Sequence, residues 1–346
     1  EAVRIGGWRR RFSSRFSDLA DLLRESSYVA QKTGSQVVSR RHVEEANAAR
    51  RRRHSLTADR SREFISEGVI TIETSGDAVG QVNGLAVYDL GHHRFGKPSR
   101  ITAQVGLGRR GVINVERHAG LSGPTYDKGV SILTGFLLGT FARRSPLTMS
   151  CSVTFEQSYG GIDGDSASST EVYAILSALS GIGLRQDLAV TGSVDQFGRV
   201  QAIGGVNEKI EGFFKVCENA GLTGTQGVLI PSSNVGDLSL ATDVVEAVEG
   251  GQFQVWAVDT IAQGIEILTG APAGQWTEKR GWTSGSVFEK CQNRLDEMTE
   301  LMRQATKGGG AEAAAGHSGM AAIATYLGRE LADTGWQRPA TELAAT

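Results

Sequence analysis

The chain has 346 residues, of which 40% are hydrophobic and 21% charged, and its formal net charge is −2. This composition is typical of a globular protein and excludes a fibrous or low-complexity one, and the length predicts two domains with a possible third small element. We find no apolar run that could span a membrane and no signal peptide. Cysteines are too few and scattered for a disulfide framework or a zinc site, so we expect a cytoplasmic protein without a metal. They are Cys151, Cys217 and Cys291.

The charge is unevenly distributed along the chain. Residues 1–62 contain 15 Lys+Arg and 7 Asp+Glu, a net charge of +8, whereas the remainder contains 21 and 31, a net charge of −10. A basic segment of this kind can contact nucleic acid, an acidic partner or the acidic body of its own chain. The basic runs at Arg9–Arg11 and at Arg50, Arg51, Arg52 and Arg53 therefore leave nucleic-acid contact open, although solvated helix ends or lid contacts to a nucleotide are the simpler interpretation.

The first segment has helical periodicity. Apolar residues recur at helical spacing over 15–33, and Gly34 ends the pattern. Ser39 then predicts the N-cap of a second helix, which runs into the arginines at 50–53. We therefore expect residues 1–62 to form a small all-α subdomain.

Beyond residue 65 short β-type runs appear, separated by glycine and polar turn residues, and strands then alternate with helices. This order predicts an α+β (mixed α/β) domain with one mixed sheet over residues 65–272. The predicted strands are 69–72, 82–87, 101–105, 112–115, 148–155, 188–194, 227–230 and 253–258, and the predicted helices are 127–142, 167–181, 208–220 and 261–268.

The C-terminal part, residues 273–346, has no role that we can identify. Residues 287–305 have the apolar spacing of an amphipathic helix, and Gly308–Ala315 is rich in Gly and Ala, which predicts a linker. Residues 316–346 show only a weak helical pattern.

Two glycine-rich segments match nucleotide-binding motifs in letters only. Gly106–Gly111 fits G-x-G-x-x-G but lies between two β-type runs rather than before a helix, which predicts a hairpin turn. Gly91–Pro98 resembles a P-loop, but Pro98 replaces the hydroxyl residue that holds magnesium. We therefore expect no cofactor in this chain and no ATP hydrolysis by it alone. His92 and His93 have no further ligands at metal spacing and are predicted to be surface loop residues.

Ser166 and Lys209 are the pair most indicative of chemistry. A serine hydroxyl needs a partner that removes its proton, and a lysine can do so when burial keeps its amine neutral for part of the time. Ser166 precedes a predicted helix, whose first N–H groups could stabilise an oxyanion, and Lys209 is flanked by apolar residues on another. This pattern indicates a hydrolase with a Ser-Lys dyad. The two segments are Gly164-Asp165-Ser166-Ala167-Ser168 and Gly204-Gly205-Val206-Asn207-Glu208-Lys209.

These segments resemble the proteolytic domain of Lon proteases, over about residues 65–272. Its G-D-S-A-S serine motif is similar to that of the LonB-like branch, and the separation of Ser166 and Lys209 fits the family. Residues 1–62 resemble the small helical lid of the AAA+ module that precedes the protease. Further resemblance lies in Gly80-Gln81-Val82-Asn83-Gly84-Leu85-Ala86, Phe155–Ser169 and Ala189-Val190-Thr191-Gly192-Ser193-Val194.

The resemblance implies roles for individual residues. Ser166 would be the nucleophile and Lys209 the general base, and Thr191 would orient the lysine amine. Asp163 and Asp165 would help to set the active or inactive arrangement of the serine loop. Glu116, expected on a strand, would be an acidic neighbour of the lysine.

The function implied is a serine endopeptidase that cleaves unfolded polypeptides as a homo-hexamer. It would depend on ATP and Mg when joined to an AAA+ module absent from this chain, which opens with Glu1 and is expected to be a fragment. One alternative is a non-catalytic Lon-fold module for scaffolding or DNA binding, although this predicts loss of the serine or lysine. Another is an ATP-independent peptidase. An inactive arrangement with Ser166 and Lys209 apart also remains open.

Overall fold

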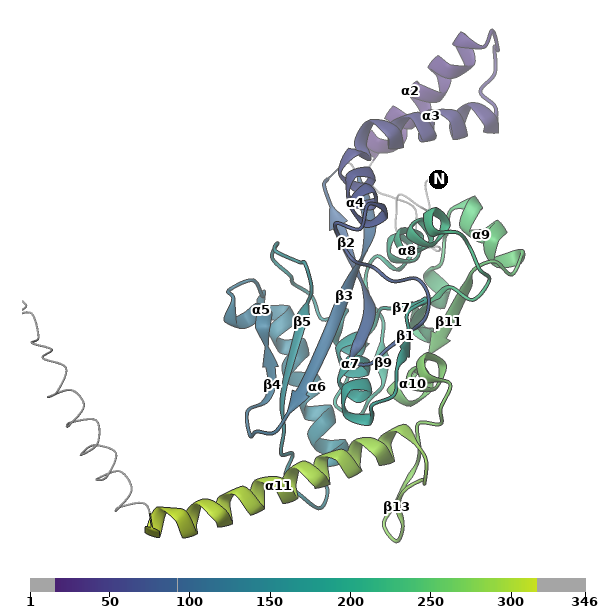
Figure 1. Ribbon diagram of the computed structural model, residues 1–346. Coiled ribbons are helices and arrows are strands. Elements are labelled where there is room, and N and C mark those ends of the chain that lie inside the picture. The colour runs from purple at the N-terminus through teal and green to yellow at the C-terminus, as the bar shows by residue number, and fades with distance from the viewer. Residues whose placement is uncertain (1–15, 92, 316–346) are drawn as a thin grey trace, which may run out of the picture. The chain divides into compact units, whose positions relative to one another are not determined.

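The computed structural model describes residues 16–91 and 93–315, with side chains as far as residue 305 (Figure 1). The chain divides into two compact units, Glu1–Asp296 and Glu297–Thr346. None of the described helices is both long and apolar enough to cross a membrane.

Three helices form the N-terminal region: α2 (Phe16–Lys32), α3 (Arg40–His54) and α4 (Leu56–Ser66). Ser39 precedes α3, as predicted, and its backbone N–H donates a hydrogen bond to His42 Nδ1 at 3.1 Å. The sequence pattern did not separate α4 from α3, and the helical region extends to the end of α4. Arg9–Arg11 lies outside the described residues.

Two residues of the basic run on α3 bind α2. The Arg50 guanidinium donates a hydrogen bond to the Asp18 carbonyl at 3.0 Å, and Arg53 forms an ion pair with Glu25 at 2.5 Å. The run thus contributes to packing within the helical region.

The segment at 69–72, predicted as a strand, is not one. Its backbone pairs with a side chain instead of a neighbouring strand: Thr71 N–H donates to Gln157 Oε1 at 2.8 Å, and Gln157 Nε2 donates to the Val69 carbonyl at 2.8 Å. A glutamine amide that offers one donor and one acceptor can thus replace a sheet partner.

A seven-stranded mixed sheet forms the centre of the domain, in the order β11-β10-β7-β2-β3-β5-β4. β2, β3 and β5 are antiparallel neighbours, whereas β2, β7, β10 and β11 run parallel and β4 runs parallel to β5. The sheet and the helices around it confirm the predicted mixed α/β class. The strands are β2 (Gln81–Asp89), β3 (Arg94–Gly106), β4 (Gly111–Asn114), β5 (Ser150–Phe155), β7 (Leu188–Val190), β10 (Gly227–Pro231) and β11 (Gln254–Val258).

The glycine-rich loop at Gly106–Gly111 is not the predicted hairpin turn. β3 and β4 lie on opposite sides of β5, and both pair with it at Ser150. The loop therefore crosses the end of β5, and a Cβ on Gly108 would lie only 2.8 Å from Ser150 Cβ. Close passage over this strand explains the glycines, which the letters of the motif alone could not distinguish from a turn.

Five longer helices accompany the sheet, and α7 and α8 contact its long strands β2 and β3. The core beside α8 contains Phe213, Phe214 and Phe253, all at most 1% exposed. The sequence pattern predicted these helices except α9. They are α6 (Pro124–Phe141), α7 (Ser168–Ser180), α8 (Val206–Ala220), α9 (Thr242–Glu249) and α10 (Ile261–Thr269).

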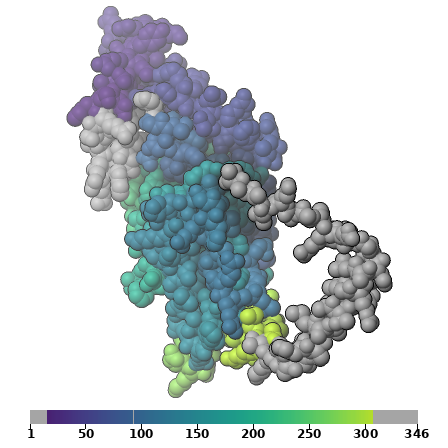
Figure 2. Space-filling model, turned by 90° about the vertical axis from the view of Figure 1, so that its left-hand side faces the viewer, coloured from purple at the N-terminus to yellow at the C-terminus, as the bar shows by residue number. Residues whose placement is uncertain are grey.

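Short elements complete the domain. Figure 2 views the left-hand side of Figure 1, where blue and teal residues of the mixed-sheet domain form much of the visible surface. The short elements are α5 (Val115–His118), the 3-10 helix Ser232–Asp237, and the strand pairs β1 (Asp77–Ala78) with β6 (Leu184–Arg185), β8 (Ser193–Val194) with β9 (Val200–Gln201) and β12 (Trp276–Thr277) with β13 (Gly281–Trp282).

The last described element, α11, spans Val287–Ala315 and includes the segment Gly308–Ala315 that was predicted to be a linker. The prediction gave the glycines too much weight, because alanine is the strongest helix former and follows them in this segment. Residues 316–346 lie outside the described residues.

Candidate active site

Ser166 lies in the loop between β5 and α7, immediately before the helix begins. Gly164 adopts a positive φ of 95°, which glycine tolerates without a Cβ clash. Among the described residues, the backbone N–H groups of Ser166 and Ala167 have no hydrogen-bond acceptor. Donors without a partner at a helix N-terminus can stabilise developing negative charge.

Asp163 fastens this loop to the start of α6. Its Oδ1 accepts hydrogen bonds from the backbone N–H groups of Thr125, Tyr126 and Gly164, at 3.0, 3.1 and 2.8 Å. These bonds, that of Gly164 foremost, hold the pKa of the Asp163 carboxyl below its ordinary value. The carboxylate thus caps the N-terminus of α6 and anchors the loop three residues before Ser166.

Lys209 lies in the first turn of α8 and reaches the serine from the other side. Its Nζ is 2.7 Å from Ser166 Oγ and 2.9 Å from Thr191 Oγ1, and the residue is only 2% exposed. Burial lowers the pKa of the amine to about 7, against the opposing effect of the charges on Asp165 and Glu208. A substantial fraction of the Lys209 amine is therefore neutral near pH 7. The side chains of Ser166 and Lys209 are in contact, and not in the separated arrangement that the sequence left open.

Thr191 follows β7 and links the Lys209 side chain to the Ser166 backbone. Its hydroxyl accepts from Lys209 and donates to the Ser166 carbonyl at 3.2 Å. The Gly192 N–H donates to the same carbonyl at 2.9 Å. One short segment after β7 therefore holds both the Ser166 backbone and the Lys209 amine by hydrogen bonds.

Asp165 lies beside the pair without contacting it. Its Oδ2 accepts a hydrogen bond from Ser193 Oγ at 2.8 Å, which turns the carboxylate toward β8. From this place its charge acts on Lys209 and favours the protonated amine. Asp165 thus opposes the effect of burial.

Glu116 differs from its expected position. It lies on α5 rather than on a strand, and its carboxylate accepts from Thr154 Oγ1 at 2.9 Å and from Phe155 N–H at 2.8 Å. The carboxylates whose charges act on the pKa of Lys209 are instead Asp165 and Glu208.

A second buried acid, Glu171 on α7, was missed by the sequence analysis. Tyr126 Oη donates to Glu171 Oε1 at 2.5 Å. Burial raises the pKa of Glu171 to about 8, and the charge of Glu116 adds to the rise. No motif marks this pair, because Tyr126 and Glu171 meet only where α6 packs against α7.

His118 and His93 have partners other than the serine. His118, on α5, has its Nδ1 2.7 Å from the carbonyl of Asn114 at the end of β4, and His93 stacks on Phe95. His92 lies outside the described residues, and the described residues contain no group of three or more His, Cys, Asp or Glu that could hold a metal ion.

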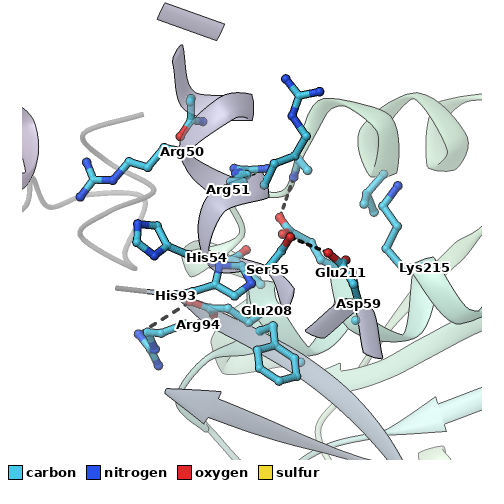
Figure 3. A pocket seen from close by; sticks show the side chains of 18 of the residues that line it. Arg50, Arg51, His54, Ser55, Asp59, His93, Arg94, Glu208, Glu211 and Lys215 are labelled. Carbon is cyan, nitrogen blue, oxygen red and sulfur yellow. Dashed lines mark hydrogen bonds and ion pairs between the residues drawn. The ribbon is translucent and has the colours of Figure 1, made fainter. Parts of the chain in front are cut away.

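A separate cavity of about 520 Å³ lies between the α3–α4 region and α8 (Figure 3). It is charged and open, with Arg94 3.7 Å from Glu208 and Lys215 2.7 Å from Asp243. Its lining includes residues of α8 on either side of Lys209 in the sequence, among them Glu208 and Glu211. The cavity therefore borders the helix of the lysine but does not contain the Ser166–Lys209 contact.

Comparison with known families matches two parts of the chain. Residues 1–53 match the family described as archaeal LonB, AAA+ ATPase lid domain, and residues 158–269 match the Lon protease (S16) C-terminal proteolytic domain. The second match contains Ser166, Thr191 and Lys209.

Relatives extend the match over most of the chain. A Lon protease homolog of Escherichia coli is 43% identical over 249 residues, which are 71% of this chain and 42% of the relative. A Lon protease homolog of Haemophilus influenzae is 38% identical and covers 80% of this chain and 47% of the relative. An archaeal Lon protease of Thermococcus kodakarensis is 32% identical, with shares of 77% and 39%.

The aligned part of the chain thus spans less than half the length of these relatives. The two family matches follow each other in the order of the two regions, the helices first and the mixed sheet second. The chain belongs to the Lon protease (S16) family, in its LonB-like branch, with a proteolytic domain preceded by an AAA+ lid.

Proposed function

We propose that this chain is a serine endopeptidase in which Ser166 is the nucleophile and Lys209 the general base. The observation that carries the proposal is the 2.7 Å contact between Lys209 Nζ and Ser166 Oγ. Burial supplies the second requirement, an amine whose pKa of about 7 allows it to take a proton.

In the first step the neutral Lys209 amine removes the Ser166 hydroxyl proton while Oγ attacks the carbonyl carbon of the scissile peptide bond. The N–H groups of Ser166 and Ala167, at the start of α7, are the candidates to stabilise the resulting oxyanion. The Lys209 ammonium then gives its proton to the leaving amine, and an acyl-enzyme forms. Water, deprotonated by the same amine, releases the new carboxylate and restores Ser166.

Thr191 and Asp163 hold this arrangement without taking part in bond breaking. Thr191 accepts a hydrogen bond from the amine and so restricts its direction. Asp163 anchors the serine loop on α6. Both restraints reduce the freedom that the reacting groups would otherwise lose on reaching the transition state.

The substrates, assembly and energy source are part of the proposal. We expect the substrates to be unfolded polypeptides. We expect the enzyme to be a homo-hexamer in the cytoplasm. ATP and Mg would act in an AAA+ module outside these 346 residues, in keeping with the share of the relatives that the chain spans. Short peptides would then be cleaved without ATP.

The test is cleavage of a fluorogenic peptide and of an unfolded protein by the wild type and by Ser166→Ala and Lys209→Ala, with and without ATP. We expect both variants to lose cleavage while remaining folded. Lys215→Met is the matched control, because this lysine lies on the same helix but is engaged with Glu218 and Asp243. Full activity of Lys209→Ala would contradict the proposal.

Nucleic-acid contact through Arg50, Arg51, Arg52 and Arg53 is a separate proposal. Contact with phosphates would weaken steeply as salt is raised, because bound counterions are released on binding. The Arg50–Asp18 and Arg53–Glu25 contacts favour a packing role for part of the run.

A further inference from the structure

At one point α8 and β3 meet backbone to backbone, without side chains between them. Gly96 on β3 lies against the first turn of α8, where a Cβ on it would be 2.7 Å from Lys209 Cα and 2.6 Å from the Glu208 carbonyl carbon. In return, a Cβ on Gly212 would be 2.8 Å from Gly96 Cα, and closer still to the Gly96 carbonyl. No side chain fits between the two backbones at this point.

Beside this contact, apolar side chains of α8 pack into the core. Phe213 and Phe214 are buried, and their rings pack near that of Phe253, with centroids 6.5 and 5.3 Å apart. Such a core resists compression, since its packing leaves little free volume. The glycine contact and the aromatic cluster beside it therefore leave α8 little room to shift.

The two reacting side chains reach each other from separately held elements. Ser166 depends on the loop that Asp163 anchors to α6, whereas Lys209 depends on α8. The distance between them is consequently set by how closely α8 approaches β3. Arg94 and Glu208, which pair across the same junction at 3.7 Å, lie at the edge of this contact (Figure 3).

We infer that Gly96 and Gly212 are positioning residues for Lys209: their backbone contact sets the depth of α8 and thereby the approach of the lysine amine to Ser166. This inference rests on the proposed function. A methyl group at either position would have to move α8 away from β3 by about 1 Å, and a misplacement of this size can reduce turnover about a hundredfold.

Gly212→Ala is the first test, because in an open helix this change favours the helix. Gly139→Ala is the matched control, since Gly139 lies inside α6 and a Cβ on it would meet no atom within 4 Å. We expect Gly212→Ala to lower kcat for a fluorogenic peptide about a hundredfold with KM nearly unchanged, and Gly139→Ala to behave as the wild type. Gly96→Ala, which acts on the same contact from the strand, should reproduce the loss.

The pH–rate profile separates positioning from a general loss of structure. A lysine moved out of its buried place should titrate at higher pH, so the midpoint of the profile should rise in Gly212→Ala, whereas partial unfolding would scale the whole profile without moving it. Melting curves recorded beside the assay fix the temperature at which each variant is folded. A folded variant with wild-type kcat would overturn the inference, and so would variants at both glycines that do not fold at any temperature tested.

The same assay distinguishes this inference from the proposed function. If Ser166→Ala and Lys209→Ala retain the wild-type rate, the dyad itself is wrong and the glycine result has no bearing on it. If both abolish cleavage and the glycine variants are folded and fully active, the dyad stands and the positioning role is wrong.

Discussion

Lys209 and Lys215 lie on the same helix and show how differently two lysines can be used. Lys209 is buried, its amine hydrogen-bonds to two hydroxyl groups, and its pKa is lowered to about 7. Lys215 is also affected by burial, which lowers its pKa, but its bonds with Asp243 and Glu218 outweigh this and raise it. Burial can make a lysine a base only where no bound carboxylate raises the pKa of its amine again.

The largest expected effect comes from removing the buried amine. Lys209→Met should lower kcat/KM at least a thousandfold, because the general base is lost. It should also stabilise the fold at pH 7 by about 2–4 kcal/mol, since the methionine carries no amine that must stay partly neutral there. Peptide cleavage and urea unfolding measure the two effects. A less stable Lys209→Met protein would contradict the comparison of the two lysines.

The sign of the stability effect has its own test. The folded-state pKa of Lys209 is below its ordinary value, so the folded protein binds fewer protons between about pH 7 and 10.5. Wild-type stability should therefore rise over this range relative to Lys209→Met, and the advantage of the variant should shrink as pH is raised.

Cleavage should depend on the same titration. Because the neutral amine is the active form, kcat/KM should fall about tenfold for each pH unit below about 7 and level off above it. The substrate should be a peptide without ionisable groups in this range, so that its own titration does not contribute to the pH–rate profile. A midpoint near the ordinary lysine value would show that burial does not control the base.

Thr191→Val replaces the hydroxyl that accepts from Lys209 by a methyl group of similar size. The loss of a hydrogen bond to a group that becomes charged costs about 1.5–3 kcal/mol, so kcat should fall about 10- to 100-fold. Thr191→Ser, which keeps the hydroxyl, is the control and should retain most activity. Equal rates for both variants would mean that the hydroxyl does not orient the amine.

The sequence was sufficient to single out Ser166 and Lys209, whose side chains are in contact, because each residue stands at the start of a helix within a recognisable motif. It was also sufficient for most strands and helices, whose periodicity is local. It was not sufficient for Glu171 or for the Gly96–Gly212 contact, since both depend on how elements distant in the sequence pack. The strand expected at 69–72 does not form, for the same reason: the side chain of Gln157, distant in sequence, hydrogen-bonds to the backbone of this segment in place of a neighbouring strand.

The smallest expected effect concerns an acid rather than a lysine. It tests whether burial disfavours the charged form of a carboxyl group as it does that of an amine. Burial raises the pKa of Glu171 to about 8, so the folded state binds more protons than the unfolded one between about pH 4.5 and 8. The stability of the wild type should accordingly decline as pH rises through this window.

Glu171→Gln keeps the size of the side chain and an oxygen that can accept from Tyr126, but cannot ionise. The variant should therefore be more stable than the wild type at pH 8, by about 1–3 kcal/mol, and no more stable at pH 4.5. Unfolding by urea at the two pH values measures the difference, and Tyr126→Phe in the Gln background tests whether the hydrogen bond itself contributes. If the advantage were the same at both pH values, the charge of Glu171 would not be its source, and burial would control the lysine alone.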